Sequence, residues 1–382
     1  MTSSSLDITV KGFIRHQPEG FRSCLTSVYS DCELMEVREN VPLASLTTLG
    51  VGGDANFFVR AGSVCDVEEA VAFSKGKKLP LFVLGGGSNL VISDRGWNGL
   101  VLQIGIPGIE DRQEQEKTLF EAGAGVDWDE FVAHCVSRNC AGVECLSGIP
   151  GSVGGTPVQN VGAYGQEVSE TIVSVLAFDL DENRVRELNA TECVFSYRTS
   201  IFNSTQRGRY IILGTTYSLI PGGSPRLQYA DLQKYFAGAD GTSTLAQVRE
   251  AVRKIRASKG MLIGPGDPDS RSAGSFFKNP ILSTSQHDEL TRRAAERKLN
   301  VPSYPALSQQ KKISAAWLVE NSGFRKGYAK GKVGISSKHA LAIVNRGGAT
   351  AADILTLKDE IQTRVEQTWG IRLEPEPVLV GF

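Results

Sequence analysis

The sequence lacks the residue patterns on which several common kinds of site depend. Its four histidines, His16, His134, His287 and His339, share no spacing, so we expect neither a metal site nor a His-based catalytic triad. The seven cysteines include no C-x-x-C pair. Three of them recur every five residues from 135 to 145, which is not a usual zinc spacing. An odd number of cysteines favours a reduced compartment.

Net charge and long apolar runs are also missing. The 41 Lys and Arg nearly balance the 42 Asp and Glu, and the formal net charge is −1. No global basic field exists to recruit nucleic acid or an anionic membrane, so an anionic ligand must be met by a few local cations. The first 20 residues do not resemble a secretory signal, and no apolar run approaches the ~20 residues that span a bilayer. We therefore expect a cytoplasmic protein without membrane insertion.

The chain is rich in glycine, with 41 residues. Its length of 382 residues suggests two or three domains. Apolar periodicity predicts an α+β arrangement, with a hairpin or loop at 111–118 and a breaker cluster at 221–225. The predicted strands cover 56–59, 81–84, 100–104, 172–179, 210–218 and 339–344, and the predicted helices cover 66–74, 126–139, 245–258, 313–321 and 351–369. The last helix begins with a capping box, Thr350 and Asp353, and ends at Gly370.

Two glycine-rich loops are the first candidate site. The segment 84–89 places three glycines directly after a strand, where backbone N–H groups can converge on an anion such as a pyrophosphate. It is neither a dinucleotide G-x-G-x-x-G fingerprint nor a Walker A loop. A second loop, 146–155, runs into 159–165. Each loop alone is also compatible with a plain tight turn, but together they favour one long ligand that touches both.

The polar segment Gly274–Pro280 is the second candidate site. It places one hydroxyl, that of Ser275, next to two phenylalanine rings and the polar side chains of a lysine and an asparagine. Three charged residues elsewhere are weaker signals. Arg198 follows a tyrosine, Lys259 follows a helix, and Glu376 lies in a Glu-Pro-Glu-Pro segment near the C-terminus. Taken singly, each is more often a solvated or salt-bridged surface charge.

Seven motifs in order nevertheless resemble one family. They are Leu49-Gly50-Val51-Gly52-Gly53, Gly85-Gly86-Gly87-Ser88-Asn89, 146–155, 159–167, Tyr197-Arg198, 274–280 and Glu374-Pro375-Glu376. Over residues 40–382 they look like UDP-N-acetylenolpyruvoylglucosamine reductase of bacterial cell-wall (peptidoglycan) synthesis. The chain departs from the pattern at Val378, where many members carry a basic residue.

The resemblance implies a domain organisation. It implies a two-part FAD-binding domain of the PCMH or vanillyl-alcohol-oxidase type followed by an α+β substrate domain. On this basis we expect an N-terminal extension at 1–40, the FAD-binding domain at 41–222, the substrate-binding domain at 223–370 and a segment returning to the active site at 371–382. A monomer is the expected state.

The resemblance also implies an activity, UDP-N-acetylmuramate dehydrogenase, in which NADPH and FAD reduce the enolpyruvyl ether of a UDP-sugar to a lactyl ether. By the family pattern, Ser275 is the proton donor, and Arg198 and Glu376 assist at the substrate carboxylate. Cofactor positions would be Gly85, Gly86, Gly87, Ser88, Asn89, Ser147, Gly148, Ile149, Gly151, Gly154 and Gly155. Substrate positions would be Tyr164, Tyr197, the gating residue Tyr229, Lys259 and Asn279.

Elementary chemistry is consistent with these roles. Hydride addition to the terminal enolpyruvyl carbon leaves an enolate, which fixed donors stabilise. Arg198 supplies cationic donors, whereas Glu376 helps only when it is protonated. Two alternatives stay open at this point: another FAD oxidase or dehydrogenase on the same scaffold, and a non-catalytic nucleotide-binding protein, which would not need Ser275, Arg198 and Glu376.

Overall fold

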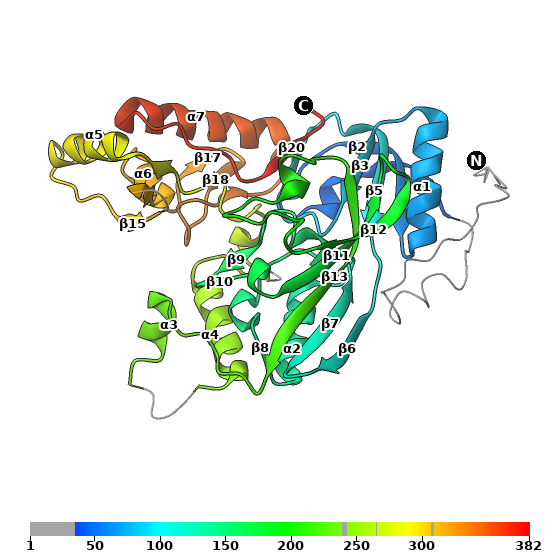
Figure 1. Cartoon of the computed structure of the whole chain (residues 1–382). Coiled ribbons are helices and arrows are strands. Elements are labelled where there is room, and N and C mark those ends of the chain that lie inside the picture. The colour runs from blue at the N-terminus through cyan, green and yellow to red at the C-terminus, as the bar shows by residue number, and fades with distance from the viewer. Residues whose placement is uncertain (1–34, 239–242, 265, 307–308) are drawn as a thin grey trace.

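The computed structural model describes residues 35–238, 243–264, 266–306 and 309–382. Most of the predicted extension, 1–34, lies outside the described residues, and the end of it enters the first strand, β1 (Arg38–Pro42). The chain then builds two sheet-based units and a smaller α+β unit (Figure 1). No helix in these described ranges is long and apolar enough to cross a membrane.

The first unit is a four-stranded sheet covered by one helix. Its order is β1-β2-β5-β3, with β1 antiparallel to its neighbour and the other pairs parallel. The remaining elements are β2 (Asp54–Ala61), β3 (Leu81–Leu84), β5 (Trp97–Ile104) and helix α1 (Val64–Lys77). A capping box of Ser63 and Asp66 begins α1, because each side chain accepts from the other residue's backbone N–H. The predictions at 56–59, 66–74, 81–84 and 100–104 are confirmed.

The second unit is a larger antiparallel sheet. Its strands run in the order β12-β11-β13-β7-β6, and β8 (Cys140–Ala141) pairs with the far end of β13. The strands are β6 (Ile109–Glu114), β7 (Lys117–Gly123), β11 (Ile172–Asp179), β12 (Arg184–Asn189) and β13 (Tyr210–Pro221), and helix α2 (Trp128–Ser137) packs beside them. The 111–118 segment is a hairpin, and the helix and strands predicted for this region are confirmed.

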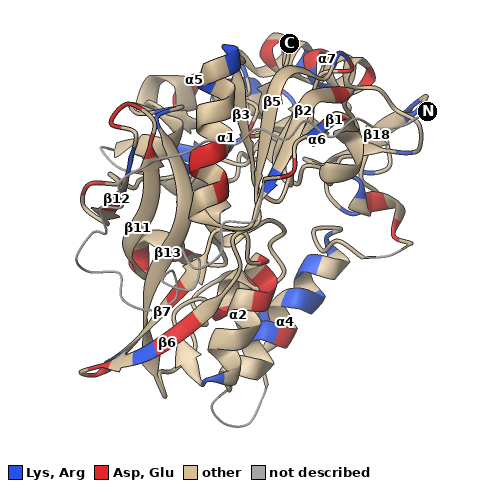
Figure 2. Cartoon of the chain, turned by 90° about the vertical axis from the view of Figure 1, so that its right-hand side faces the viewer, with Lys and Arg blue, Asp and Glu red and all other residues tan. Residues whose placement is uncertain are grey.

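Helices α3 (Ala230–Tyr235) and α4 (Leu245–Ser258) pack against the second unit. The apolar face of α4 contacts Cys145 and Tyr164 in one small core. Its basic face lies beside the acidic start of α2 (Figure 2), where Asp129 forms ion pairs with Arg249 and Arg253. Helix α4 thus tethers the chain after the predicted 222/223 boundary to the glycine-rich loop region.

The third unit combines helices with two small antiparallel sheets. The helices are α5 (Thr284–Ala295), α6 (Ala315–Glu320) and α7 (Ala351–Trp369). The first sheet has the order β14 (Ile281–Leu282), β16 (Lys311–Ile313), β15 (Ser303–Pro305). The second sheet has the order β17 (Ala329–Lys330), β18 (Val333–Ile335), β19 (Ile343–Asn345). Its core also takes in Leu49, Val51 and Val91 of the first unit.

Two predictions in the third unit need correction. The strand expected at 339–344 begins only at Ile343, because the Ser336 hydroxyl accepts from two backbone N–H groups and folds 336–342 into a turn. The helix expected from Ile313 begins at Ala315, because Ser314 caps it and Ile313 completes β16. The prediction for α7 is confirmed, with the Thr350–Asp353 capping box and a left-handed Gly370.

The C-terminus returns to the first unit as strand β20 (Val378–Val380). It pairs in parallel with β4 (Leu90–Ile92), which follows the first glycine loop directly. Val380 is 4% exposed and packs into a core with Phe58 and Leu84. This pairing fixes the position of the segment that precedes β20.

We expect Val380→Ala to lower the free energy of unfolding by about 1–3 kcal/mol, because it removes two buried methyl groups and leaves a cavity. A guanidinium titration followed by circular dichroism measures the effect. Val378→Ala is the matched control in the same strand, because Val378 is 39% exposed, and we expect a change within about 0.5 kcal/mol. Equal losses in the two variants would contradict the burial that anchors β20.

Candidate active site

One cavity of about 1500 Å³ lies where the three units meet. Most of the residues predicted to form the site line it, from both glycine loops, the Tyr197-Arg198 turn, the Ser275 segment and the C-terminal segment. They are Gly85, Gly86, Gly87, Ser88, Asn89, Ile149, Gly151, Gly155, Tyr164, Tyr197, Arg198, Tyr229, Lys259, Ser275, Asn279 and Glu376. Ser147, Gly148 and Gly154 do not line it.

The two glycine loops lie in direct contact. A Cβ on Gly86 would lie 2.7 Å from the Gly151 Cα, so no side chain fits between them. Gly87 has a φ of +65°, and a Cβ there would be 1.9 Å from the Leu46 carbonyl oxygen. The Ser88 hydroxyl donates to the Pro150 carbonyl at 3.0 Å. The glycines therefore expose backbone on two adjoining walls of the cavity.

Residues of α2 and α4 bind the second glycine loop at Gly148, which does not line the cavity. Asp129 accepts a 2.6 Å hydrogen bond from the Gly148 amide, and Arg256 Nε donates at 3.0 Å to the Gly148 carbonyl. Burial alone would raise the pKa of Asp129, but the hydrogen bonds from Arg249 and from Gly148 outweigh it and lower that pKa. Gly148 thus shapes the loop from outside the cavity wall, and the sequence did not identify its two partners.

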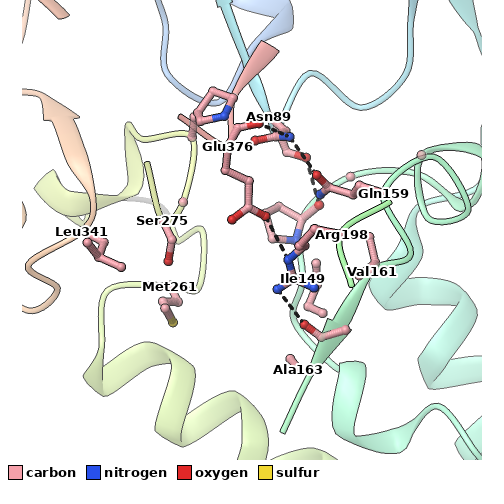
Figure 3. Close-up of a pocket in the computed structure, with 18 of the residues that line it drawn as sticks. Asn89, Ile149, Gln159, Val161, Ala163, Arg198, Met261, Ser275, Leu341 and Glu376 are labelled. Carbon is pink, nitrogen blue, oxygen red and sulfur yellow. Dashed lines mark hydrogen bonds and ion pairs between the residues drawn. The ribbon is translucent and has the colours of Figure 1, made fainter. Parts of the chain in front are cut away.

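Arg198 occupies a strained turn. Its φ is +55°, in the left-handed region that non-glycine residues rarely adopt, and the Asn203 amide donates to its carbonyl at 3.1 Å. The guanidinium donates to the Gly162 carbonyl at 3.0 Å, and its Nε lies 3.1 Å from Glu376 Oε1 (Figure 3). The turn therefore directs the guanidinium toward Glu376 in the cavity.

Glu376 lies on a segment that runs between the Ser275 segment and the first glycine loop. Its backbone N–H donates to the Phe276 carbonyl at 2.9 Å, and its carbonyl accepts from the Asn89 amide at 3.3 Å. Asn89 also donates to Gln159 at 3.0 Å. Burial raises the pKa of Glu376, while Arg198 and Lys278 oppose the rise. The carboxyl is thus closer to its neutral form than an exposed glutamate.

Ser275 is fixed by what flanks it. Phe276 and Phe277 are buried in the core of the third unit, and Gly274 has a φ of +71°. The side chains of Ser275, Arg198 and Glu376 are all directed into the same pocket (Figure 3). Ser275 Oγ lies 2.9 Å from His339 Nε2. The sequence did not identify His339 as a site residue, and its only signal there was that histidine is scarce.

The predicted substrate residues form two groups on the cavity wall. In the first, the rings of Tyr164 and Tyr229 meet edge to face at 5.4 Å, and the Lys259 ammonium lies 5.9 Å from the Tyr164 ring centre while it pairs with Asp231. Burial raises the pKa of Tyr164, and Arg256 and Lys259 counter it.

In the second group, Tyr197 and Asn279 both line the cavity, and Asn279 Oδ1 accepts from the Ala315 amide at 2.9 Å. The Lys312 ammonium lies 4.7 Å from the centre of the Tyr197 ring. Each group therefore places a cation on an aromatic face at the cavity. Within the described residues, no cluster of three or more His, Cys, Asp or Glu is arranged to hold a metal ion.

Comparisons with known proteins agree with this arrangement. Residues 55–188 match the FAD binding domain model, and residues 267–380 match the model described as UDP-N-acetylenolpyruvoylglucosamine reductase, C-terminal domain. These matches confirm the α+β prediction of an FAD-binding part followed by a second domain.

Individual relatives span nearly the whole chain. UDP-N-acetylenolpyruvoylglucosamine reductase of Thermobifida fusca is 47% identical over 348 residues, 90% of this chain and 97% of the relative. The enzyme of the same name from Streptomyces coelicolor is 42% identical, over 91% of each chain. The crystal structure of UDP-N-acetylenolpyruvylglucosamine reductase from Thermus caldophilus covers 91% of this chain and 100% of its own, with a TM-score of 0.59 at 24% identity.

Proposed function

Because this chain belongs to the UDP-N-acetylenolpyruvoylglucosamine reductase family, we propose that Ser275, Arg198 and Glu376 perform the substrate half of that family's reaction. The protein is an FAD- and NADPH-dependent oxidoreductase of peptidoglycan precursor synthesis, a UDP-N-acetylmuramate dehydrogenase. The observation that carries the proposal is the convergence of these three side chains, from distant parts of the chain, in one cavity bounded by both glycine loops.

The residues present suit FAD. The adjoining backbones of Gly86 and Gly151 admit no side chain between them, and exposed loop N–H groups are the usual partners of a pyrophosphate. The hydroxyl of Ser152 lines the same cavity, and no partner for it is found among the described residues. Backbone of 85–89 and of 149–155 would hold the cofactor, which supplies the hydride when it is bound.

We expect Gly86→Ala to weaken FAD binding at least about tenfold, which corresponds to about 1.4 kcal/mol, because the added methyl group separates the two loops. Titration of the apoprotein with FAD, followed by flavin fluorescence, measures the change. Gly76→Ala is the matched control, because a Cβ at Gly76 in α1 meets nothing within 4 Å. Unchanged affinity in Gly86→Ala would show that the contact between the loops is not needed for the cofactor.

Arg198 and Glu376 are placed to receive the substrate carboxylate. Hydride addition at the terminal enolpyruvyl carbon pushes negative charge onto the adjacent carbon and into the carboxylate. Arg198 already holds its guanidinium in the cavity, and one fixed donor at such a charge is worth ~2.7–4 kcal/mol. A charged Glu376 would repel the same group. An approaching carboxylate raises the pKa of Glu376 further, in the direction in which burial already moves it.

Substrate binding should therefore be coupled to proton uptake at Glu376. Between the pKa of Glu376 in the free enzyme and its higher pKa in the complex, we expect an uptake approaching one proton per substrate bound, and the affinity should fall as the pH rises across this interval. Calorimetry in buffers of different ionisation enthalpy measures the uptake. In Glu376→Gln, which cannot titrate, the uptake should vanish. Uptake that persists in this variant would assign the proton to another group.

Ser275 supplies the last atom of the product. Its O–H bond breaks, the proton forms the new C–H bond at the carbon beside the carboxylate, and Oγ keeps the electron pair. The buried Phe276 and Phe277 hold the hydroxyl at one point on the cavity wall. A positioned acid contributes ~10²–10⁴-fold.

We expect Ser275→Ala to lose ~10²–10⁴-fold in reduction of the enolpyruvyl sugar, because no acid remains at this position. Reduction of the bound flavin by NADPH should be unchanged, because it does not use this proton. Stopped-flow absorbance separates the two half-reactions. Ser285→Ala, an exposed position in α5, is the control. Normal turnover of Ser275→Ala would exclude Ser275 as the acid.

Several coarser features accompany this proposal. We infer that the UDP-sugar and NADPH are the small-molecule partners. The cytoplasmic location, the monomeric state and the domain limits at 40, 222 and 370 stay predictions. We propose that the Glu-Pro-Glu-Pro segment brings Glu376 to the substrate. Val378, which follows this segment, also lines the cavity and has an apolar side chain.

A further inference from the structure

The contact between Ser275 and His339 has no role in the function described so far. The two side chains meet at 2.9 Å, from Oγ to Nε2, and both residues line the active-site cavity. Their backbones are joined as well, because the Phe276 N–H donates to the Leu341 carbonyl at 2.8 Å. This backbone bond, next to Ser275 and two residues after His339, makes the side-chain contact a built feature of the fold.

The turn that carries His339 is itself fixed. The Ser336 hydroxyl, whose side chain is buried, accepts from the backbone N–H of Lys338 and from that of His339, at 3.0 and 3.1 Å. The Ala342 N–H donates to the His339 carbonyl at 3.2 Å. This turn replaces residues 339–342 of the strand that the sequence predicts at 339–344.

The surroundings of His339 keep its ring neutral. Burial, followed by the positive charges of Lys326, Lys259 and Arg256, lowers its pKa to about 4. Of the facing groups, Lys259 is paired with Asp231, and the adjacent Lys338 is paired with Asp267. A neutral imidazole has one N–H donor and one acceptor nitrogen, so Nε2 either donates to Ser275 or accepts from it.

We propose that His339 is a positioning residue for Ser275, whose Oγ accepts a hydrogen bond from Nε2–H so that the hydroxyl proton is free to point at the substrate. In the opposite tautomer Nε2 would accept a hydrogen bond from the Ser275 hydroxyl, whose proton would then point at the ring. The donating tautomer also stabilises the oxygen as the O–H bond breaks, because the electron pair stays on Oγ. Solvent then returns a proton to Oγ, and His339 keeps its own.

The inference rests on the proposed role of Ser275, and its test is designed to separate the two. We expect His339→Leu to slow the reduction of the enolpyruvyl sugar by ~10²–10³-fold, the usual effect of removing one donor from a developing oxyanion. Reduction of the bound flavin by NADPH should stay unchanged. His339→Gln places an amide N–H near the position of Nε2 and should recover the rate to within about tenfold of the native protein. His287→Leu on α5, outside the cavity, is the matched control.

A second readout does not depend on turnover. In ¹⁵N NMR of the native holoenzyme with labelled histidine, we expect the His339 ring to carry its proton on Nε2, and to keep it there from about pH 5 to about pH 8. A ring protonated on Nδ1, or on both nitrogens at neutral pH, would overturn the inference. So would a normal substrate half-reaction in His339→Leu while Ser275→Ala is inactive. If Ser275→Ala is itself fully active, the proposed function of Ser275 fails first.

Discussion

The active site depends on the pairing of β20 with β4. This short parallel pair brings the last residues of the chain beside the first glycine loop, and Val380 anchors it in the core of the first unit. The preceding segment is then held on both sides, by the Phe276 carbonyl and by Asn89. The Glu376 backbone is thus bonded to the Phe276 carbonyl and to the Asn89 side chain. These bonds join the cofactor loop, the carboxyl and the Ser275 segment into one connected structure.

A second constraint concerns Arg198. Left-handed backbone at a non-glycine residue costs of order 1–3 kcal/mol and persists only where the surroundings impose it. Here the Asn203 amide and the Gly162 carbonyl hold the two ends of the residue, one through the backbone and one through the guanidinium. In the mechanism that we propose, this strain fixes a cation opposite Glu376 before the substrate arrives, which would reduce the reorganisation needed during the reaction.

Local signals allowed much of the fold to be predicted from the sequence. Helix α7 could be delimited because its capping box and its terminal glycine act within one turn, and the glycine loops could be recognised because tight backbone contact demands glycine. The turn at His339 could not, because an apolar run that reads as a strand is redirected by one buried hydroxyl, Ser336. The Ser275–His339 contact could not be predicted either, because it joins two residues that no spacing in the sequence relates.

Burial determines much of the electrostatics of the cavity, because it acts on one acid and one base. Burial shifts the acid Glu376 and the base His339 toward their neutral forms, because each loses the hydration that favours its charged form. The cations Arg198, Lys259 and Lys312 stay in place on the same walls. The cavity therefore combines fixed positive charge with an acid and a base whose neutral forms are favoured by burial. In the proposed mechanism the anionic substrate gains further negative charge as it becomes an enolate. This combination would then favour the enolate over the ground state, whereas a charged Glu376 would oppose it.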